Sequence, residues 1–128
     1  MTIAGIGTDL VEIDRLAAAL ERFGQRFGER ILGRDELIEW ERGRRSPRFL
    51  AKRFAAKEAA AKALGTGFRN GIRFVDIQVR HDELGKPELV FLAAAAARAE
   101  ALGVVRSELS ISDERSYAVA FVVLVGTG

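Results

Sequence analysis

The sequence predicts one α+β domain over residues 1–128, with a mostly antiparallel sheet and a long helix packed on it. Three observations carry this prediction. Strand-like and helical segments mix without regular βαβ alternation, an alanine-rich helical run occupies 47–64, and two strand-like runs near the C-terminus are separated by a short polar turn. A chain of 128 residues suits a single compact domain.

In the first part of the chain, Thr2–Gly7 is short, apolar and punctuated by glycine, which predicts a strand that ends near Thr8 and Asp9. A helical pattern follows, because Leu16, Leu20, Phe23 and Phe27 recur at spacings of four, three and four. Gly24 weakens this helix, so a break is expected there. A second short helix is predicted over Asp35–Arg42, followed by a loop through 43–47.

The clearest element is the helix from Pro47 to Leu64. Ser46 suits its N-cap, proline suits a first helical position, and Gly65 suits the position after its end. The elements expected after it are a strand over Ile72–Arg80, a tight turn at Asp82–Pro87, a strand over Glu88–Phe91, a helix from Ala93 that Gly103 closes, and a hairpin of Leu109–Ser112 with Tyr117–Val125.

Composition excludes several classes of site. The chain has no cysteine, so a disulfide framework, a thiolate metal site and a cysteine nucleophile are excluded. The single histidine, His81, cannot build a multi-histidine metal site. The N-terminus lacks the basic region of a signal peptide, and the apolar runs are shorter than the roughly 20 residues of a membrane helix, so we expect a cytoplasmic protein without a membrane partner.

Two polar groups of residues interrupt the apolar pattern where chemistry is possible. Asp9 stands at the end of the first predicted strand, and Glu58 and Lys62 share one face of the long helix before the turn Gly65-Thr66-Gly67. Two carboxylates beside a lysine and a glycine-rich turn suit Mg²⁺ bound together with a diphosphate, since Mg²⁺ takes one or two carboxylates and completes its shell with phosphate oxygens and water.

Each of these features also has a structural interpretation. Glu58 and Lys62 are spaced as an i,i+4 surface ion pair, and Asp9 is placed to be the N-cap of the helix that follows it. Arg15, Arg22, Arg26 and Arg30 form a stripe that suits either a solvated helix face or a docking surface. From Arg42 to Arg53 there are six basic residues and no acidic one, a pattern that suits a solvated loop, phosphate contact or nucleic acid.

Four segments together resemble holo-[acyl-carrier-protein] synthases, the small 4′-phosphopantetheinyl transferases. They are IGTDLVEIDR at Ile6–Arg15, RFAAKEAAAKALGTG at Arg53–Gly67, DELGKP at Asp82–Pro87 and LSISDERSYAVAFVVL at Leu109–Leu124. They occur in the family's order and spacing, and the resemblance covers essentially the whole chain. It implies the fold of that family and transfer of 4′-phosphopantetheine from coenzyme A to a serine of apo-acyl carrier protein, with release of 3′,5′-ADP, in fatty acid biosynthesis.

The resemblance also implies roles for individual residues. Asp9 and Glu58 would hold Mg²⁺, and with Lys62 they would form the catalytic set. The residues that would contact coenzyme A are Arg53, Lys57, Lys62, Gly65, Thr66 and Gly67. Arg15, Arg22, Arg26 and Arg30 would dock the acidic carrier protein, and the family's active sites lie between the subunits of a homotrimer.

One position departs from the family pattern. Many members have a histidine after the Ser-x-Ser of the C-terminal hairpin, whereas this chain has Asp113. The base that accepts the serine proton is left open between Glu58 and a water molecule on the metal. Two other functions are kept as alternatives: a homologue that binds coenzyme A and transfers nothing, and a nucleic-acid-binding module that uses Arg42–Arg53. We expect no nucleic-acid partner, because only Phe49 and Phe54 supply aromatic rings in that stretch.

Overall fold

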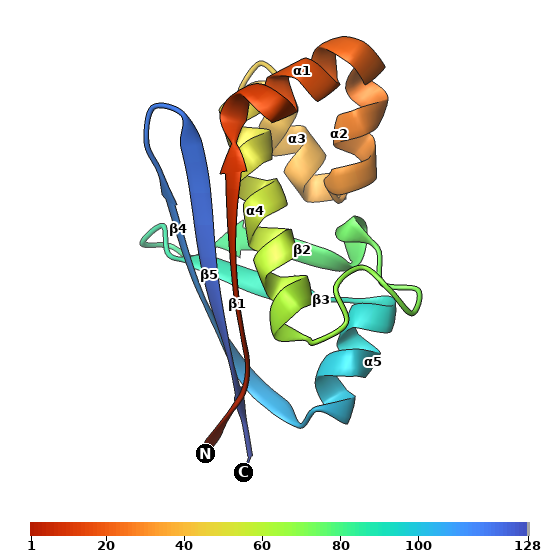
Figure 1. Ribbon diagram of the computed structural model, residues 1–128, viewed down its shortest axis with the longest axis vertical. Coiled ribbons are helices and arrows are strands. Elements are labelled where there is room, and N and C mark those ends of the chain that lie inside the picture. Colours follow the sequence, from red (N-terminus) through yellow and green to blue (C-terminus); the bar gives the residue numbers. More distant parts are fainter. Residues whose placement is uncertain (128) are drawn as a thin grey trace.

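The centre of the fold is a three-stranded antiparallel sheet in the order β1–β5–β4. In the computed structural model, which describes residues 1–127, β1 is Thr2–Glu12, β4 is Val104–Asp113 and β5 is Tyr117–Gly126. The first and last strands lie side by side, with Thr2 opposite Gly126 and Glu12 opposite Tyr117. Both chain ends therefore leave the same end of the molecule (Figure 1).

The long helix α4, Pro47–Ala63, runs along one face of this sheet (Figure 1). It starts as the sequence predicts, because the Ser46 hydroxyl accepts a hydrogen bond from the Phe49 N–H at 3.2 Å. Alanines let the helix approach the sheet closely, and seven of them are buried: Ala51, Ala55, Ala56, Ala59, Ala60, Ala61 and Ala63. Burial on several sides is why its sequence shows little amphipathic periodicity.

Two glycines of β1 make this close approach possible. A Cβ atom added to Gly7 would lie 2.0 Å from the carbonyl oxygen of Ala59, and one added to Gly5 would lie 2.0 Å from that of Ala63. The strand backbone thus lies directly on the helix backbone. This contact brings the following residue on the same face of the strand, Asp9, to the exposed face of α4 that carries Glu58 and Lys62.

Three short helices cover one end of the molecule (Figure 1). They are α1 (Ile13–Phe23), α2 (Gln25–Ile31) and α3 (Arg34–Arg42). The predicted break at Gly24 is confirmed, since this residue has a φ of 70° and separates α1 from α2. Trp40 of α3 is fully buried and packs against Gly28, where a Cβ would come within 2.5 Å of the indole ring.

A second, two-stranded sheet joins β2 (Ile77–His81) to β3 (Pro87–Phe91), and α5 (Ala93–Ala101) follows it. The strand predicted over Ile72–Arg80 is correct only from residue 77. Before it, Phe74–Asp76 forms a 3₁₀ turn, η1, because the Asp76 carboxylate accepts a hydrogen bond from the Arg73 N–H at 3.1 Å. This local bond closes a turn that the apolar pattern does not reveal.

Two predicted strand boundaries, and the alternative that Asp9 is a helix N-cap, are also corrected. The first strand extends to Glu12 rather than ending near Thr8 and Asp9, because its pairing with β5 continues to that residue. Asp9 pairs with Ala120 inside β1, so it is not a helix N-cap; Glu12 holds that position and its side chain makes no capping bond. The penultimate strand begins at Val104, earlier than predicted. Within residues 1–127, no helix combines the length and the apolar character needed to cross a bilayer.

Candidate active site

Asp9 and Lys62 meet where β1 lies on α4. The Lys62 ammonium donates to Asp9 Oδ1 at 3.0 Å and to the Thr8 carbonyl oxygen at 3.0 Å. The Asp9 side chain is 15% exposed, whereas that of Lys62 is 52% exposed. The carboxylate is therefore held in place by its surroundings, while the ammonium lies at the surface, where an anionic ligand can reach it.

Glu58 lies one helical turn before Lys62 and is half-buried. Burial raises its pKa above the ordinary value, the nearby Asp9 carboxylate raises it further, and Lys62 opposes both effects. Two carboxylates from different elements thus disfavour each other's negative charge. A cation placed between them would relieve this repulsion, which is the electrostatic condition of a metal site.

The two carboxylates suit Mg²⁺ better than a metal ion whose ligands all come from the protein. Within residues 1–127 there is no group of three or more His, Cys, Asp or Glu side chains placed to hold an ion, so Asp9 and Glu58 are the two carboxylates on offer. Mg²⁺ is commonly bound by one or two carboxylates, with phosphate oxygens and water in the other positions. The residues present therefore suit an ion that arrives with a phosphorylated ligand.

The space beside these residues is open to such a ligand. A shallow cavity of about 320 Å³ adjoins Lys62 and is lined by Ile6, Gly7, Thr8 and Phe121. The turn Gly65-Thr66-Gly67 follows α4 with φ values of 82° and 60° at its two glycines, which is left-handed backbone that glycine adopts without strain. The predicted turn residues thus lie at the end of the helix that carries Glu58 and Lys62.

Two residues expected to contact coenzyme A are placed elsewhere. Lys57 is fully buried and Arg53 is 4% exposed, and both ion-pair with the buried Glu36. The prediction that they bind the ligand directly is corrected by this burial. The cause is visible in the helix: a side chain next to Glu58 in sequence points about 100° away from it around α4 and meets α3 instead of solvent.

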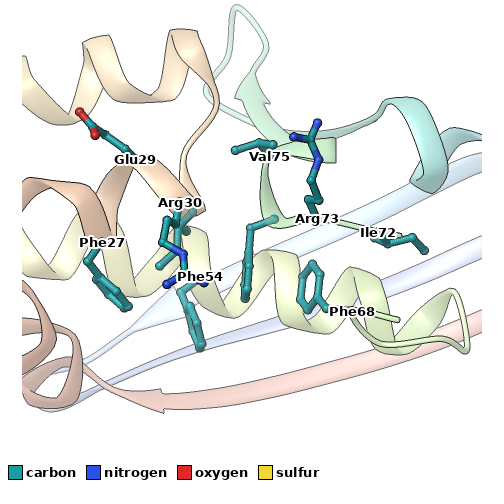
Figure 2. A pocket seen from close by; sticks show the side chains of 10 residues that line it. Phe27, Glu29, Arg30, Phe54, Phe68, Ile72, Arg73 and Val75 are labelled. Carbon is teal, nitrogen blue, oxygen red and sulfur yellow. The ribbon is translucent and has the colours of Figure 1, made fainter. Parts of the chain in front are cut away.

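A second, larger cavity of about 540 Å³ begins one turn further along the same face of α4 (Figure 2). Phe54 precedes Glu58 by four residues and lines the cavity. Its ring stacks with Phe74 at 5.4 Å between centroids, and Phe74 stacks with Phe68 at 3.9 Å. Figure 2 shows Phe54 between Phe27 and Arg30 on one side and Phe68 and Arg73 on the other.

Three of the four predicted docking arginines line one groove. Arg22, Arg26 and Arg30 surround a hollow of about 720 Å³ together with Phe23, Phe27 and Glu29. Arg22 stacks over the Phe23 ring at 5.1 Å, and Phe23 is 55% exposed. Arg15 is exposed on α1 but does not line this groove. The surface combines cationic groups with an exposed aromatic ring.

Asp113 joins the hairpin of β4 and β5 to the start of α4. Arg48 donates to Asp113 Oδ2 at 2.9 Å and to the carbonyl oxygens of Glu114 and Arg115 at 2.6 and 3.1 Å. Lys52 lies 3.6 Å from the other carboxylate oxygen. The Arg48 hydrogen bond, aided by Lys52, holds the pKa of Asp113 below its ordinary value despite some desolvation. Asp113, which stands where many members of the resembling family have a histidine, therefore has a structural role in this chain.

Sequence reasoning missed the phenylalanine cavity and Glu36. The i,i+4 spacing of Phe54 and Glu58 on an otherwise small-residue helix was a usable signal for the first. Glu36 gave no signal, because a glutamate in the first turn of a short polar helix is ordinary. Its burial depends on tertiary packing against α4.

Comparison with known proteins agrees with this geometry. Residues 5–122 match the model of the 4′-phosphopantetheinyl transferase superfamily. The holo-[acyl-carrier-protein] synthase of Halorhodospira halophila is 59% identical over 96% of this chain and 98% of its own length. Among solved structures, that enzyme from Neisseria meningitidis has a TM-score of 0.91 at 46% identity, covering 97% of this chain and 99% of its own.

A further solved structure links this fold to a ligand. The holo-(acyl-carrier-protein) synthase of Bacillus anthracis, in complex with CoA (3′,5′-ADP), has a TM-score of 0.82 at 39% identity, with 99% of this chain and 100% of that one covered. Family match, sequence identity and fold agree over nearly the whole length. The chain therefore belongs to the 4′-phosphopantetheinyl transferase superfamily, and within it to the holo-[acyl-carrier-protein] synthases.

Proposed function

We propose that this transferase moves the 4′-phosphopantetheine group of coenzyme A to a serine of apo-acyl carrier protein in a Mg²⁺-dependent reaction that releases 3′,5′-ADP. The observation that carries the proposal is the meeting of Asp9, Glu58 and Lys62 on an open face, on the same side of α4 as a cavity of about 540 Å³ that Phe54 lines. Supply of holo-carrier protein to fatty acid biosynthesis is the pathway we propose, and a cytoplasmic location stays a prediction from the sequence.

The order of side chains along α4 supports a direction for the ligand. Lys62, Glu58 and Phe54 follow one another at successive turns of one helix face. The diphosphate would lie at Lys62 and Glu58, and the pantetheine arm would run toward Phe54 into the phenylalanine-lined cavity. Apolar walls with a few polar groups at the rim suit a chain of methylenes and amides.

In the transfer step, the serine Oγ of the carrier forms a bond to the phosphorus that bears the pantetheine arm. The bond from that phosphorus to the bridging oxygen breaks, and its electron pair leaves on 3′,5′-ADP. Asp9 and Glu58 would hold Mg²⁺, which neutralises phosphate charge when it is bound. Lys62 would offset the charge that grows on the leaving phosphate. Glu58 or a water molecule beside it takes the serine proton, so that protons balance.

The arginine groove supports docking of an acidic carrier protein. Three arginines, Arg22, Arg26 and Arg30, present positive charge around the exposed Phe23 ring. Arg30 lines both this groove and the phenylalanine-lined cavity. A carrier bound there would place its serine close to the end of the arm. Charge complementarity of this kind mainly accelerates encounter and selects the partner.

We also propose a homotrimer. The sheet face opposite α4 is exposed and apolar, with Ile6 at 60%, Leu10 at 64% and Phe121 at 47% exposure. Thr8 pairs with Phe121 and Leu10 with Val119 in neighbouring strands, so these side chains form a continuous patch. Patches of this kind commonly mark an interface, and the resemblance to the family supplies the trimeric symmetry.

The run Arg42–Arg53 gives little support to the nucleic-acid alternative. Arg53 is buried, Arg48 holds the β4–β5 hairpin, and Arg45 lies 3.7 Å from Glu41. Most of the run is engaged within the chain instead of forming a free cationic stripe. The absence of a nucleic-acid partner stays a prediction, which a filter-binding assay would test.

The decisive experiment is intact-mass spectrometry of apo-acyl carrier protein after incubation with this protein, coenzyme A and Mg²⁺. A mass gain equal to phosphopantetheine is expected with the wild type and not with the Asp9→Ala/Glu58→Ala variant or with chelator. A gain that survives in the double variant would refute the assigned site. Binding of coenzyme A without any mass gain would instead favour the homologue that binds and does not transfer.

A further inference from the structure

A buried ion cluster adjoins the phenylalanine-lined cavity, and the proposed reaction does not use this cluster. Lys57 of α4 is fully buried, and its three N–H donors all have acceptors. The ammonium donates to the Ile31 carbonyl oxygen at 2.5 Å, to Glu36 Oε1 at 2.7 Å and to the Phe74 carbonyl oxygen at 3.1 Å. No donor remains for a ligand.

Two of these three acceptors belong to residues that line the cavity. Ile31 ends α2 on one wall, and Phe74 begins η1 on the other. Lys57 itself lies on α4, which supplies Phe54 to the same cavity. The Lys57 ammonium thus links α4 to the backbones of α2 and η1 around the cavity. It does not line the cavity itself and can affect it only through these elements.

Glu36 fixes the position of Lys57. Its Oε1 also accepts the Gly33 N–H at 2.9 Å, and its Oε2 accepts from Arg53 and from the Val79 N–H, both at 3.2 Å. Arg53 is held in turn by the Val79 carbonyl oxygen at 3.2 Å. Every buried side-chain nitrogen and oxygen within residues 1–127 has a hydrogen-bond partner, so this cluster is fully satisfied.

A pocket whose walls are held apart in the right place binds its ligand more tightly, because the ligand does not have to order them. A buried lysine costs desolvation that an apolar residue would avoid, so its burial here is weak evidence for a purely stabilising role. We infer that Lys57, oriented by Glu36, is a positioning residue: it sets the separation of Ile31 and Phe74 and thereby the fit of the pantetheine arm. This inference rests on the proposed function, because it takes the arm to lie in the cavity.

The test compares two ligands that differ in the arm. Coenzyme A carries the arm, whereas 3′,5′-ADP lacks it, and the affinity of each is measured by isothermal titration calorimetry in magnesium buffer. For Lys57→Met we expect coenzyme A to bind about tenfold more weakly, with 3′,5′-ADP within about twofold of wild type; about tenfold is the lower end of the loss seen when a residue that orients metal ligands from behind is removed. Lys52→Met, a change on the same helix away from the cavity, should leave both affinities unchanged.

A variant that does not fold would hide the effect, so a second one removes both charges of the pair. Lys57→Met/Glu36→Gln leaves Arg53 opposite Glu39, at 3.3 Å, and keeps the remaining buried charge balanced. It should show the same selective loss for coenzyme A. An equal loss for both ligands, or no loss for either, would overturn the positioning role while leaving the transferase proposal intact. A wild type that binds no coenzyme A would overturn both.

Discussion

The Lys62 ammonium lies 3.0 Å from Asp9 Oδ1, so a protein cation already contacts one of the two carboxylates that we assign to Mg²⁺. In the proposed site, this lysine would compete with the metal for Asp9 when no ligand is bound. With ligand bound, the lysine would be able to move to the phosphates, because more than half of its side chain is exposed. In this proposal one residue therefore has two effects: it opposes metal binding in the free protein and supports the chemistry in the complex.

Lys62→Met should separate these two effects. Mg²⁺ should bind the free variant more tightly than wild type, because the competing cation is gone, while kcat should fall by about 10²-fold, the usual scale for loss of one charge-stabilising group. Calorimetric titration with Mg²⁺ and a time course of carrier modification by mass spectrometry measure the two quantities. A variant in which metal affinity and kcat fall together would contradict the competition.

Glu58 predicts how the stability of the metal-free protein depends on pH. Its pKa is raised in the folded state, chiefly by burial, so the folded chain binds the proton more strongly than the unfolded chain does. Its contribution to stability is complete below the ordinary glutamate pKa of 4.5 and is lost as pH rises through the folded pKa. Glu58→Gln should thus become progressively more stable than wild type as pH rises in EDTA.

Thermal melting of both proteins from acidic to neutral pH measures this difference. Added Mg²⁺ should reverse the order, because the metal stabilises only the protein that keeps both carboxylates. A difference in melting temperature between the two proteins that stays constant with pH would show that Glu58 keeps an ordinary pKa.

Gly7→Ala should damage both fold and site. The added methyl group would lie 2.0 Å from the Ala59 carbonyl oxygen, and backbone on both sides leaves it no room. Overpacking of this kind costs about 1–3 kcal/mol, and moving β1 displaces Asp9. Gly43→Ala is the matched control, because its Cβ would meet the nearest atom at an ordinary 3.5 Å and its φ is −84°. Urea unfolding compares the two; equal midpoints would refute the close packing.

Arg22→Glu should raise the KM for carrier protein and leave kcat nearly unchanged, since this side chain lines the groove of the first two helices, whereas Asp9 does not. The effect should shrink as salt is added, because exposed charges are screened. Arg106→Glu, on β4, keeps the same change of net charge and should leave KM as in wild type. An equal effect from both variants would indicate only a response to net charge.

Leu10→Glu should disrupt assembly, because it places a charge in the apolar patch on the outer sheet face. Sedimentation velocity is expected to show trimer for wild type and smaller species for the variant. Ile38→Glu, at an exposed position of 45% on α3, is the control and should remain trimeric. A wild type that sediments as a monomer would refute the trimer directly.

The sequence predicted most of the fold because local signals were strong where they mattered. Ser46, Pro47 and the alanines marked α4, and Gly24 marked the break between α1 and α2. Boundaries that depend on pairing were missed. The first strand continues to Glu12 only because β5 pairs with it, and a partner 105 residues away leaves no local trace at that position.

The site residues divide in the same way, into those with a local signal in the sequence and those whose position depends on tertiary packing. Asp9, Glu58 and Lys62 were identified from spacing and family resemblance, and the structure brings them together. Lys57 was misplaced for the opposite reason. Its neighbour Glu58 made it look like part of the site, but one residue along a helix changes the direction of a side chain by about 100°. Only packing against Glu36 shows where it points.

The pairing of β1 with β5 has a consequence for biosynthesis. Asp9 is translated 111 residues before its sheet partner Ala120. A nascent chain still inside the ribosome beyond residue 116 has no partner for the strand that carries Asp9. The residues that we propose to bind Mg²⁺ therefore come together only after the hairpin has left the ribosome, by which time α4 has already been made. A stalled or truncated product would keep Glu58 and Lys62 and still be inactive.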